Sequence, residues 1–255
     1  MTGAGTNTYI IGEGPDIAVL DPGPAIDSHI DAIVAACDGK LAKIVCTHTH
    51  PDHSPAAAVL AERFNVPLIG ALSADDRHQD PTFRPDEHLQ HDDVIAGRGW
   101  TLRAIATPGH VDNHFCFLLE EEGLVFAGDH IMNGSTVVIV PPGGDMQAYI
   151  ASLQKLLDYR VYAIAPGHGE VIPDCRGEVE KLIRHRLLRE AKVVGALSDQ
   201  AQSLDDLVVT VYDDVDPMMH EWAKLSLLAH LIKLEDERRT LKTAQEGVDH
   251  WQLAA

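Results

Sequence analysis

Short apolar segments alternate with polar turns through the first 170 residues. Residues 8–12 and 16–21, separated by a Gly-Glu-Gly-Pro turn, predict a hairpin. Further strands are predicted at 43–47, 66–70, 101–106, 114–119, 124–127, 136–140 and 161–165. Apolar residues at helical spacing predict helices at 26–38, 55–64 and 145–158. Residues 71–99 are polar and predict a long surface excursion near a functional site. Strands mixed with helices indicate an α/β or α+β sandwich with its site on one rim.

The pattern becomes helical after about residue 176. Helices are predicted at 178–198, at 203–212, where Ser203 can cap the helix, and at 217–236, before two short strands around Glu246-Gly247. Three helices followed by a hairpin are typical of a winged-helix module. We therefore predict a catalytic domain over residues 1–175 and a winged-helix-like domain over residues 176–255. The apolar positions of the third helix fit packing on its own core and a homodimer contact equally well.

The lengths of the apolar runs, the N-terminal segment and the cysteine spacing together favour a cytoplasmic protein without a membrane partner. No apolar run approaches the roughly 18 residues that a membrane span requires. The N-terminus lacks the basic and apolar regions of a signal peptide. The four cysteines are scattered, without a C-x-x-C pair, which favours reduced thiols.

The chain is strongly acidic, with a formal net charge of −19. Residues 1–175 hold 9 Lys and Arg against 24 Asp and Glu, a net charge of −15. Such a surface disfavours non-specific binding to polyanions or anionic membranes. Basic residues gather only on the predicted helix at 176–192, as a solvated face where an anionic substrate would be met. These are Arg176, Lys181, Arg184, His185, Arg186, Arg189 and Lys192.

Candidate metal ligands crowd into the segment Thr47-His48-Thr49-His50-Pro51-Asp52-His53. Alternate positions of an extended chain point to one side, and imidazole and carboxylate are suitable zinc ligands. His110, Asp129 and His168 each follow a predicted strand, in turns where a neighbouring glycine allows close backbone approach. Seven ligands are too many for one tetrahedral ion, but they suit two ions that share a carboxylate.

The motifs THTHPDH, TPGH, FAGDH and PGHG, in this order and at this spacing, resemble the metal-binding motifs of the metallo-β-lactamase superfamily. The resemblance implies a four-layer αββα sandwich in which His48, His50 and His110 hold one divalent ion. Asp52, His53 and His168 would hold a second ion, and Asp129 would bridge them. TNTYIIG, RHRLLRE and LLAHLIKLEDE resemble the lactamase-beta-like branch, which carries a C-terminal winged-helix-like domain. That branch also implies one more strand before TNTYIIG, so we expect either a trimmed first sheet or a start codon later than usual.

Three further residues are candidates for supporting the site. Asp21, in the DPG turn at 21–23, is expected to hydrogen-bond a ligand imidazole or the motif loop. His114 is a candidate for contacting either a metal ligand or the substrate, and His130 is expected in the pocket wall rather than as a ligand. The cofactors are two divalent ions, zinc first, with manganese and iron as alternatives.

These residues predict a dinuclear hydrolase in which a metal-bound hydroxide attacks a small ester, thioester, lactone or lactam. Asp52 is both a ligand and the predicted catalytic residue that orients the nucleophile. The first alternative is an endoribonuclease that cleaves single-stranded RNA, which the winged-helix-like domain and basic helix would suit. The second alternative is a non-catalytic metal-binding protein whose C-terminal domain docks a partner.

Overall fold

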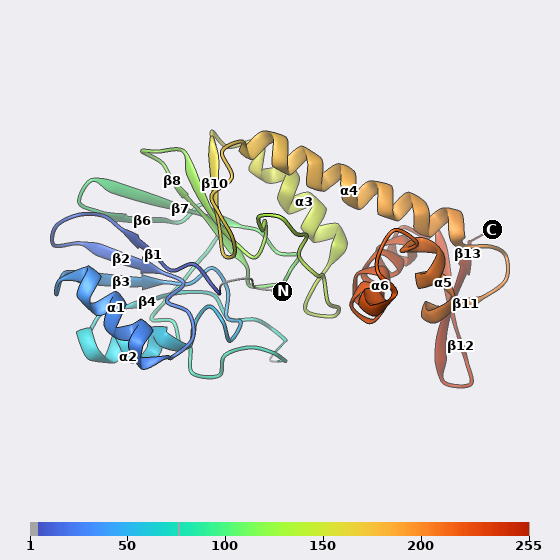
Figure 1. Ribbon diagram of the computed structural model, residues 1–255, viewed down its shortest axis with the longest axis horizontal. Helices are drawn as coiled ribbons and strands as arrows, with labels where there is room; N and C mark the ends of the chain where they lie inside the picture. The colour runs from blue at the N-terminus through green and yellow to red at the C-terminus, as the bar shows by residue number, and fades with distance from the viewer. Residues whose placement is uncertain (1–4, 76, 255) are drawn as a thin grey trace.

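The computed structural model describes residues 5–75 and 77–254, and its first two thirds contain two five-stranded sheets (Figure 1). The first sheet has the order β1 (Tyr9–Ile11), β2 (Ile17–Leu20), β3 (Leu41–Val45), β4 (Leu68–Gly70), β5 (Glu87–His88). The second has the order β10 (Ala163–Pro166), β9 (Leu124–Gly128), β8 (Phe115–Leu119), β7 (Trp100–Ala106), β6 (Val94–Gly97). Four helices accompany them, α1 (Asp27–Cys37), α2 (Pro55–Phe64), α3 (Met146–Leu156) and α4 (Cys175–Ala196).

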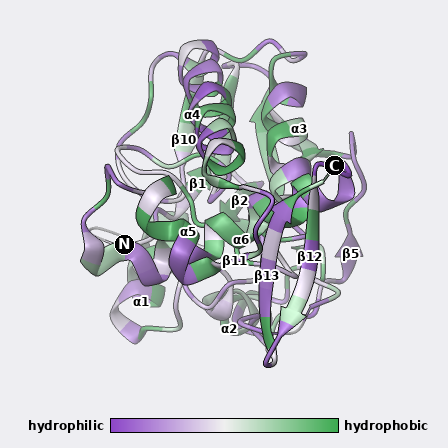
Figure 2. Ribbon diagram, turned by 90° about the vertical axis from the view of Figure 1, so that its right-hand side faces the viewer, coloured by the Kyte–Doolittle hydropathy of each residue, from purple (hydrophilic) through white to green (hydrophobic). Residues whose placement is uncertain are grey.

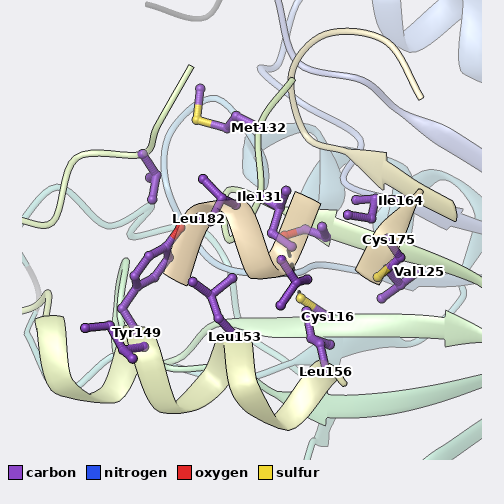
Figure 3. Close-up of a cluster of buried hydrophobic side chains, with 14 of the residues drawn as sticks. Cys116, Val125, Ile131, Met132, Tyr149, Leu153, Leu156, Ile164, Cys175 and Leu182 are labelled. Carbon is purple, nitrogen blue, oxygen red and sulfur yellow. Dashed lines mark hydrogen bonds between the residues drawn. The ribbon is translucent and has the colours of Figure 1, made fainter. Parts of the chain in front are cut away.

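Three apolar cores separate four layers. Leu20 and Val45 of the first sheet pack against Leu102 and Phe117 of the second, between the sheets. Side chains of α1 and α2 cover the outer face of the first sheet. Residues of α3 and α4, such as Leu153 and Leu182, cover the second (Figure 3). The αββα sandwich predicted from the motifs is therefore confirmed.

Two sequence-based expectations about this part were wrong in detail. Residues 136–140, predicted as a strand, pair with no strand in the described part of the chain. Other elements hold them by hydrogen bonds instead, with Arg186 donating to the carbonyl of Val137 and Ile139 N–H donating to Ser226 Oγ. The excursion at 71–99 contains β5 and β6, which are too short and too exposed for periodicity to reveal them. The N-terminal hairpin is confirmed, with Tyr9 opposite Leu20 in antiparallel register.

The C-terminal region forms a separate small core. It consists of β11 (Gln202–Ser203), α5 (Leu204–Val211), the 3-10 turn η1 (Pro217–Met219), α6 (His220–Asp236), β12 (Thr240–Gln245) and β13 (Val248–Leu253). Ser203 caps α5 as predicted, since its hydroxyl accepts from the backbone N–H of Asp206. In Figure 2 this region faces the viewer, with α6 behind the β12–β13 hairpin. Leu207, Leu227 and Trp251 lie at its centre, and the predicted winged-helix order is confirmed.

Helix α4 connects the two regions and belongs to both. Its first turns place Val179 and Leu182 in the core beneath α3, and its last turns place Val193 in the C-terminal core. The division at 175/176 stays a prediction, because this helix contributes to either side of it. The predicted solvated basic face was wrong for Arg186 and Arg189, which are both buried.

Two further expectations concern the environment of the protein. In the described residues no helix combines the length and apolarity that crossing a membrane would require. All four cysteines are buried and free of disulfides.

Candidate metal centre

The seven predicted ligands meet at one rim of the sandwich, although they come from four separate segments of the chain. The 47–53 loop follows β3, His110 follows β7, Asp129 follows β9 and His168 follows β10. These four strands end at the same rim because the two sheets face one another. The strand-end positions that the sequence indicated thus become neighbours in space.

Three imidazoles form the first cluster. Nε2 of His48 and Nε2 of His110 lie 3.0 and 3.1 Å from Nδ1 of His50. The three nitrogens converge on one point within the distance that could hold a metal ion. The same residues were assigned to one ion by the resemblance.

The second cluster combines imidazole and carboxylate. Oδ1 of Asp129 lies 3.3 Å from Nε2 of His53 and 3.2 Å from Nε2 of His168. Oδ2 of Asp52 lies 3.4 Å from Nε2 of His168 and 3.8 Å from Nε2 of His53. Oδ2 of Asp129 faces the first cluster, 3.8 Å from Nε2 of His110. Asp129 therefore presents one oxygen to each cluster.

The buried ligand atoms fit a cation. Nε2 of His53, Nε2 of His168 and Oδ1 of Asp129 are buried and have no hydrogen-bond partner among the described residues. Buried polar atoms without partners are costly, and these three are all of types that ligate zinc. A divalent ion at each cluster would satisfy them.

The second nitrogen of four rings is held by the protein. Nδ1 of His53 lies 3.0 Å from Oδ2 of Asp21, and Nδ1 of His110 lies 3.1 Å from the carbonyl of Val138. Nδ1 of His168 lies 3.0 Å from the carbonyl of Gly5. The fourth is His48, whose Nδ1 lies 3.0 Å from the hydroxyl of Thr47. Acceptors at Nδ1 assign the proton to that atom and leave each Nε2 lone pair for a metal.

Asp21 organises the ligand loop from beneath. Its carboxylate accepts from the backbone N–H and the hydroxyl of Thr47, each at 2.7 Å, as well as from His53. Because the Thr47 hydroxyl donates to Asp21, it accepts from His48. Asp21 thus supports two ligand rings, one directly and one through Thr47. It was predicted to do this from the DPG turn, whereas Thr47 was not singled out, although it opens the THTHPDH motif.

Glycines beside the ligands are needed for space. A Cβ on Gly128 would lie 2.6 Å from Thr47 Oγ1 and 2.7 Å from His114 Nε2. A Cβ on Gly167 would lie 2.8 Å from Oδ1 of Asp129. Close backbone approach was the expected use of these glycines.

The two clusters differ in their affinity for protons. Burial and the neighbouring imidazoles lower the pKa of His50 to about 4 and that of His48 well below its usual value. Burial also acts on His168, but the carboxylates of Asp129 and Asp52 outweigh it and raise its pKa to about 10. Asp129 and Asp21 likewise raise the pKa of His53 against the effect of burial. The first cluster is neutral, and the second attracts positive charge.

His114 and His130 lie behind the ligands. Nε2 of His114 accepts from the backbone N–H of Asp129 at 3.2 Å, and its Nδ1 lies 2.9 Å from the hydroxyl of Thr107. His114 therefore positions the shared carboxylate rather than a substrate. His130 is fully buried beside Tyr149, and burial lowers its pKa to about 3, so it is neutral. Both residues lie outside the ligand clusters described above.

A mostly apolar pocket of about 330 Å³ opens beside the first cluster. His50 and His110 of the first cluster are among its lining residues, together with Val140 and Pro141. Asp75, Arg77, His78 and Gln79 come from the polar excursion, which confirms its expected position near the site. Trp222 and Leu225 of α6 also line the pocket, and no motif or spacing in the sequence indicated them.

Comparisons with known proteins agree with this arrangement. The metallo-beta-lactamase superfamily matches residues 1–168, and the beta-lactamase associated winged helix domain matches residues 203–251. An atrochrysone carboxyl ACP thioesterase of Aspergillus chevalieri is 31% identical over 260 residues, 97% of this chain and 81% of that protein. A beta-lactamase-like protein 2 homolog of Drosophila melanogaster is 32% identical, over 96% of this chain and 88% of its own. A metallo-beta-lactamase family protein of Thermus thermophilus has a similar structure, with a TM-score of 0.78 at 20% identity, covering 97% of this chain and 93% of its own.

Proposed function

Since the chain belongs to the metallo-β-lactamase superfamily and is a metal-dependent hydrolase, we propose that it uses two zinc ions to hydrolyse a small thioester or related carbonyl compound. The observation that carries this proposal is the pair of ligand clusters joined by Asp129. His48, His50 and His110 would hold one ion, and Asp52, His53 and His168 the other. Cytoplasmic location and a homodimer stay predictions.

The ligand residues would hold the ions where a carbonyl group could reach them. Bound zinc supplies two effects, a lower pKa for water and polarisation of a carbonyl oxygen. The side chain of Asp52 is 40% exposed, whereas that of Asp129 is 11% exposed. Asp52 is therefore the carboxylate that an incoming water can reach. We assign it to orient that water, accept its proton and pass the proton to the leaving group.

The pocket beside the first cluster favours a small, uncharged acyl group. Val111, Val140, Pro141, Trp222 and Leu225 give its lining an apolar part, and the protein has a net charge of −19. Thioesters are favoured among carbonyl compounds because a similar fungal protein is named as an acyl carrier protein thioesterase. Lactones, lactams and simple esters share the electrophilic carbonyl and are alternatives.

RNA cleavage is the less favoured alternative. Four cations of α4 have carboxylate partners, at 3.5 Å or less, so they present little net positive charge to a phosphate backbone. These pairs are Arg176–Glu180, Lys181–Glu178, Arg189–Asp214 and Lys192–Asp213.

The proposal is tested by assaying zinc-loaded protein on N-acetylcysteamine thioesters and on end-labelled single-stranded RNA. Asp52→Ala, purified identically, controls for contaminating enzymes. We expect thioester hydrolysis that falls by about 10²–10⁴-fold in the variant, the usual contribution of an acid–base group. RNA cleavage that disappears in the variant would establish the nuclease instead. If neither substrate is turned over, the thioester and RNA readings both fail, and lactones, lactams and simple esters become the next substrates to assay.

A further inference from the structure

We propose that α6 of the C-terminal region builds the acyl-binding wall of the active-site pocket, with Trp222 and Leu225 contacting an apolar acyl chain. The inference rests on the proposed function and names the part of the substrate that the pocket recognises. It assigns a catalytic use to the winged-helix region.

Trp222 and Leu225 are available for a ligand because neither is required by the core of its own region. That core is formed by Leu207, Leu227, Trp251 and their neighbours. Trp222 is instead 52% exposed and, with Leu225, lines the same pocket as His50 and His110. An exposed tryptophan beside a metal centre is a large apolar surface that an acyl chain would cover.

The wall is fixed relative to the metal ligands through residues 137–139. Nη2 of Arg186 donates to the carbonyl of Val137 at 2.6 Å, and Ile139 N–H donates to the hydroxyl of Ser226 at 3.4 Å. Between them, the carbonyl of Val138 accepts from Nδ1 of His110. One short segment thus connects α4 and α6 to the His110 ring. Because Ala229 of α6 also packs in the core beneath α3, Trp222 is held close to the centre rather than on a mobile appendage.

The chemistry of the lining selects the acyl side of a thioester. Trp222, Leu225, Val140 and Pro141 offer no charge to an acyl group. Apart from His50 and His110, the polar lining residues are Asp75, Arg77, His78 and Gln79, and Asp75 and Arg77 form an ion pair at 2.8 Å. A pantetheine-type thiol carries amide groups that suit this polar side, so the apolar part of the substrate belongs against α6. Short aliphatic or aromatic acyl chains are the expected class, and acyl chains ending in a carboxylate are disfavoured.

The test measures binding separately from hydrolysis. The probes are non-hydrolysable ketone analogues of N-acetylcysteamine thioesters, in which a methylene group separates the carbonyl from sulfur. Acetyl, butyryl and hexanoyl analogues are titrated calorimetrically into zinc-loaded wild type, Trp222→Ala, Leu225→Ala and Met218→Ala. Met218 is a matched control, because it is 87% exposed on η1 just before α6 and does not line the pocket. Melting temperatures establish that the variants are folded.

In wild type and Met218→Ala we expect affinity to rise by about two- to fourfold per added methylene group, the range for partial to full burial. In Trp222→Ala the hexanoyl analogue should bind about tenfold more weakly, as for loss of an aromatic anchor, while the acetyl analogue changes little. An unchanged chain-length dependence in Trp222→Ala and Leu225→Ala would overturn the acyl wall, whether or not thioesters are hydrolysed. The expected binding pattern without hydrolysis would leave the wall supported and refute the proposed function alone.

Discussion

Replacing Asp21 by Asn should weaken zinc binding although Asp21 touches no metal. The buried carboxylate accepts three hydrogen bonds, two from Thr47 and one from Nδ1 of His53. An Asn side chain has the same shape, but its amide nitrogen is a donor. In either orientation of the Asn amide its NH₂ meets a donor: the Thr47 N–H at the Oδ1 position, or the Thr47 hydroxyl and His53 at the Oδ2 position. In the second orientation His53 must move its proton to Nε2. Protonated Nε2 cannot ligate zinc.

The magnitude follows from the hydrogen bonds that the Asn side chain cannot accept. Loss of a group that orients a metal-ligating histidine costs about 10–100-fold in metal affinity, or about 1.4–2.8 kcal/mol. Each charge-assisted hydrogen bond that is broken also costs about 1.5–3 kcal/mol of folding free energy. The backbone adds little, because Asp21 has φ of 49° and Asn tolerates this left-handed conformation as Asp does.

The assay is competition for zinc with a chromophoric chelator, together with the free energy of unfolding. Asp80→Asn is the matched control, because Asp80 is also buried and accepts three hydrogen bonds, from Ser54 Oγ, Thr82 N–H and Thr82 Oγ1. It contacts no ligand ring in these bonds, so we expect lower stability with nearly normal zinc affinity. If Asp21→Asn and Asp80→Asn bind zinc equally well, Asp21 does not act by keeping the proton of His53 on Nδ1.

The remaining predictions also concern the centre. Gly128→Ala should cost about 2–5 kcal/mol of stability and weaken zinc binding, because the residue has φ of 46° and its Cβ would crowd Thr47 and His114; urea unfolding and the chelator assay would measure this. Zinc loading at pH 7.5 should release about two protons, from His53 and His168, detectable by calorimetry in buffers of different ionisation enthalpy. Asp129 and Asp52 raise the pKa of His168 in the folded, metal-free protein to about 10. The stabilisation that His168 gains from these carboxylates is therefore complete below about pH 6.5 and is lost as the pH rises towards 10. Removal of zinc by a chelator should lower the melting temperature by about 5–10 °C if zinc was present at about 100 times its Kd, and an unchanged value would argue against structural coupling of the ions.

The clustering of the seven candidate ligands could be predicted from the sequence because its signals are local. His48, His50, Asp52 and His53 share one loop, and each distant ligand follows a strand and a glycine. Strand ends that face one rim bring such residues together whatever the lengths of the intervening loops. Asp21 was predictable for the same reason, since its turn follows β2 at that rim.

Long-range contacts without a local signature were not predictable. Trp222 lies more than 100 residues from His110, and nothing in its neighbourhood separates a pocket wall from a packed helix. The apolar run at 136–140 resembles a strand, yet its hydrogen bonds go to Ser226 and Arg186 instead of a sheet. Periodicity reports that a segment is extended and buried, but not which groups satisfy its backbone.

The winged-helix region has a fold that is common in nucleic-acid-binding proteins, but it lacks their excess of positive charge. Residues 176–255 hold 11 Lys and Arg against 15 Asp and Glu, and buried Lys233 and exposed Arg239 are both paired with Glu190, at 2.7 and 3.1 Å. Burial and the nearby Arg186 and Arg189 lower the pKa of His185, which therefore adds no charge at neutral pH. Binding to a phosphate backbone depends on unpaired cations, because affinity comes from counterion release. Arg186, a cation of α4, is buried and donates to the carbonyl of Val137, so it is not presented to a phosphate. The region is therefore better suited to lining a small-molecule pocket than to binding RNA.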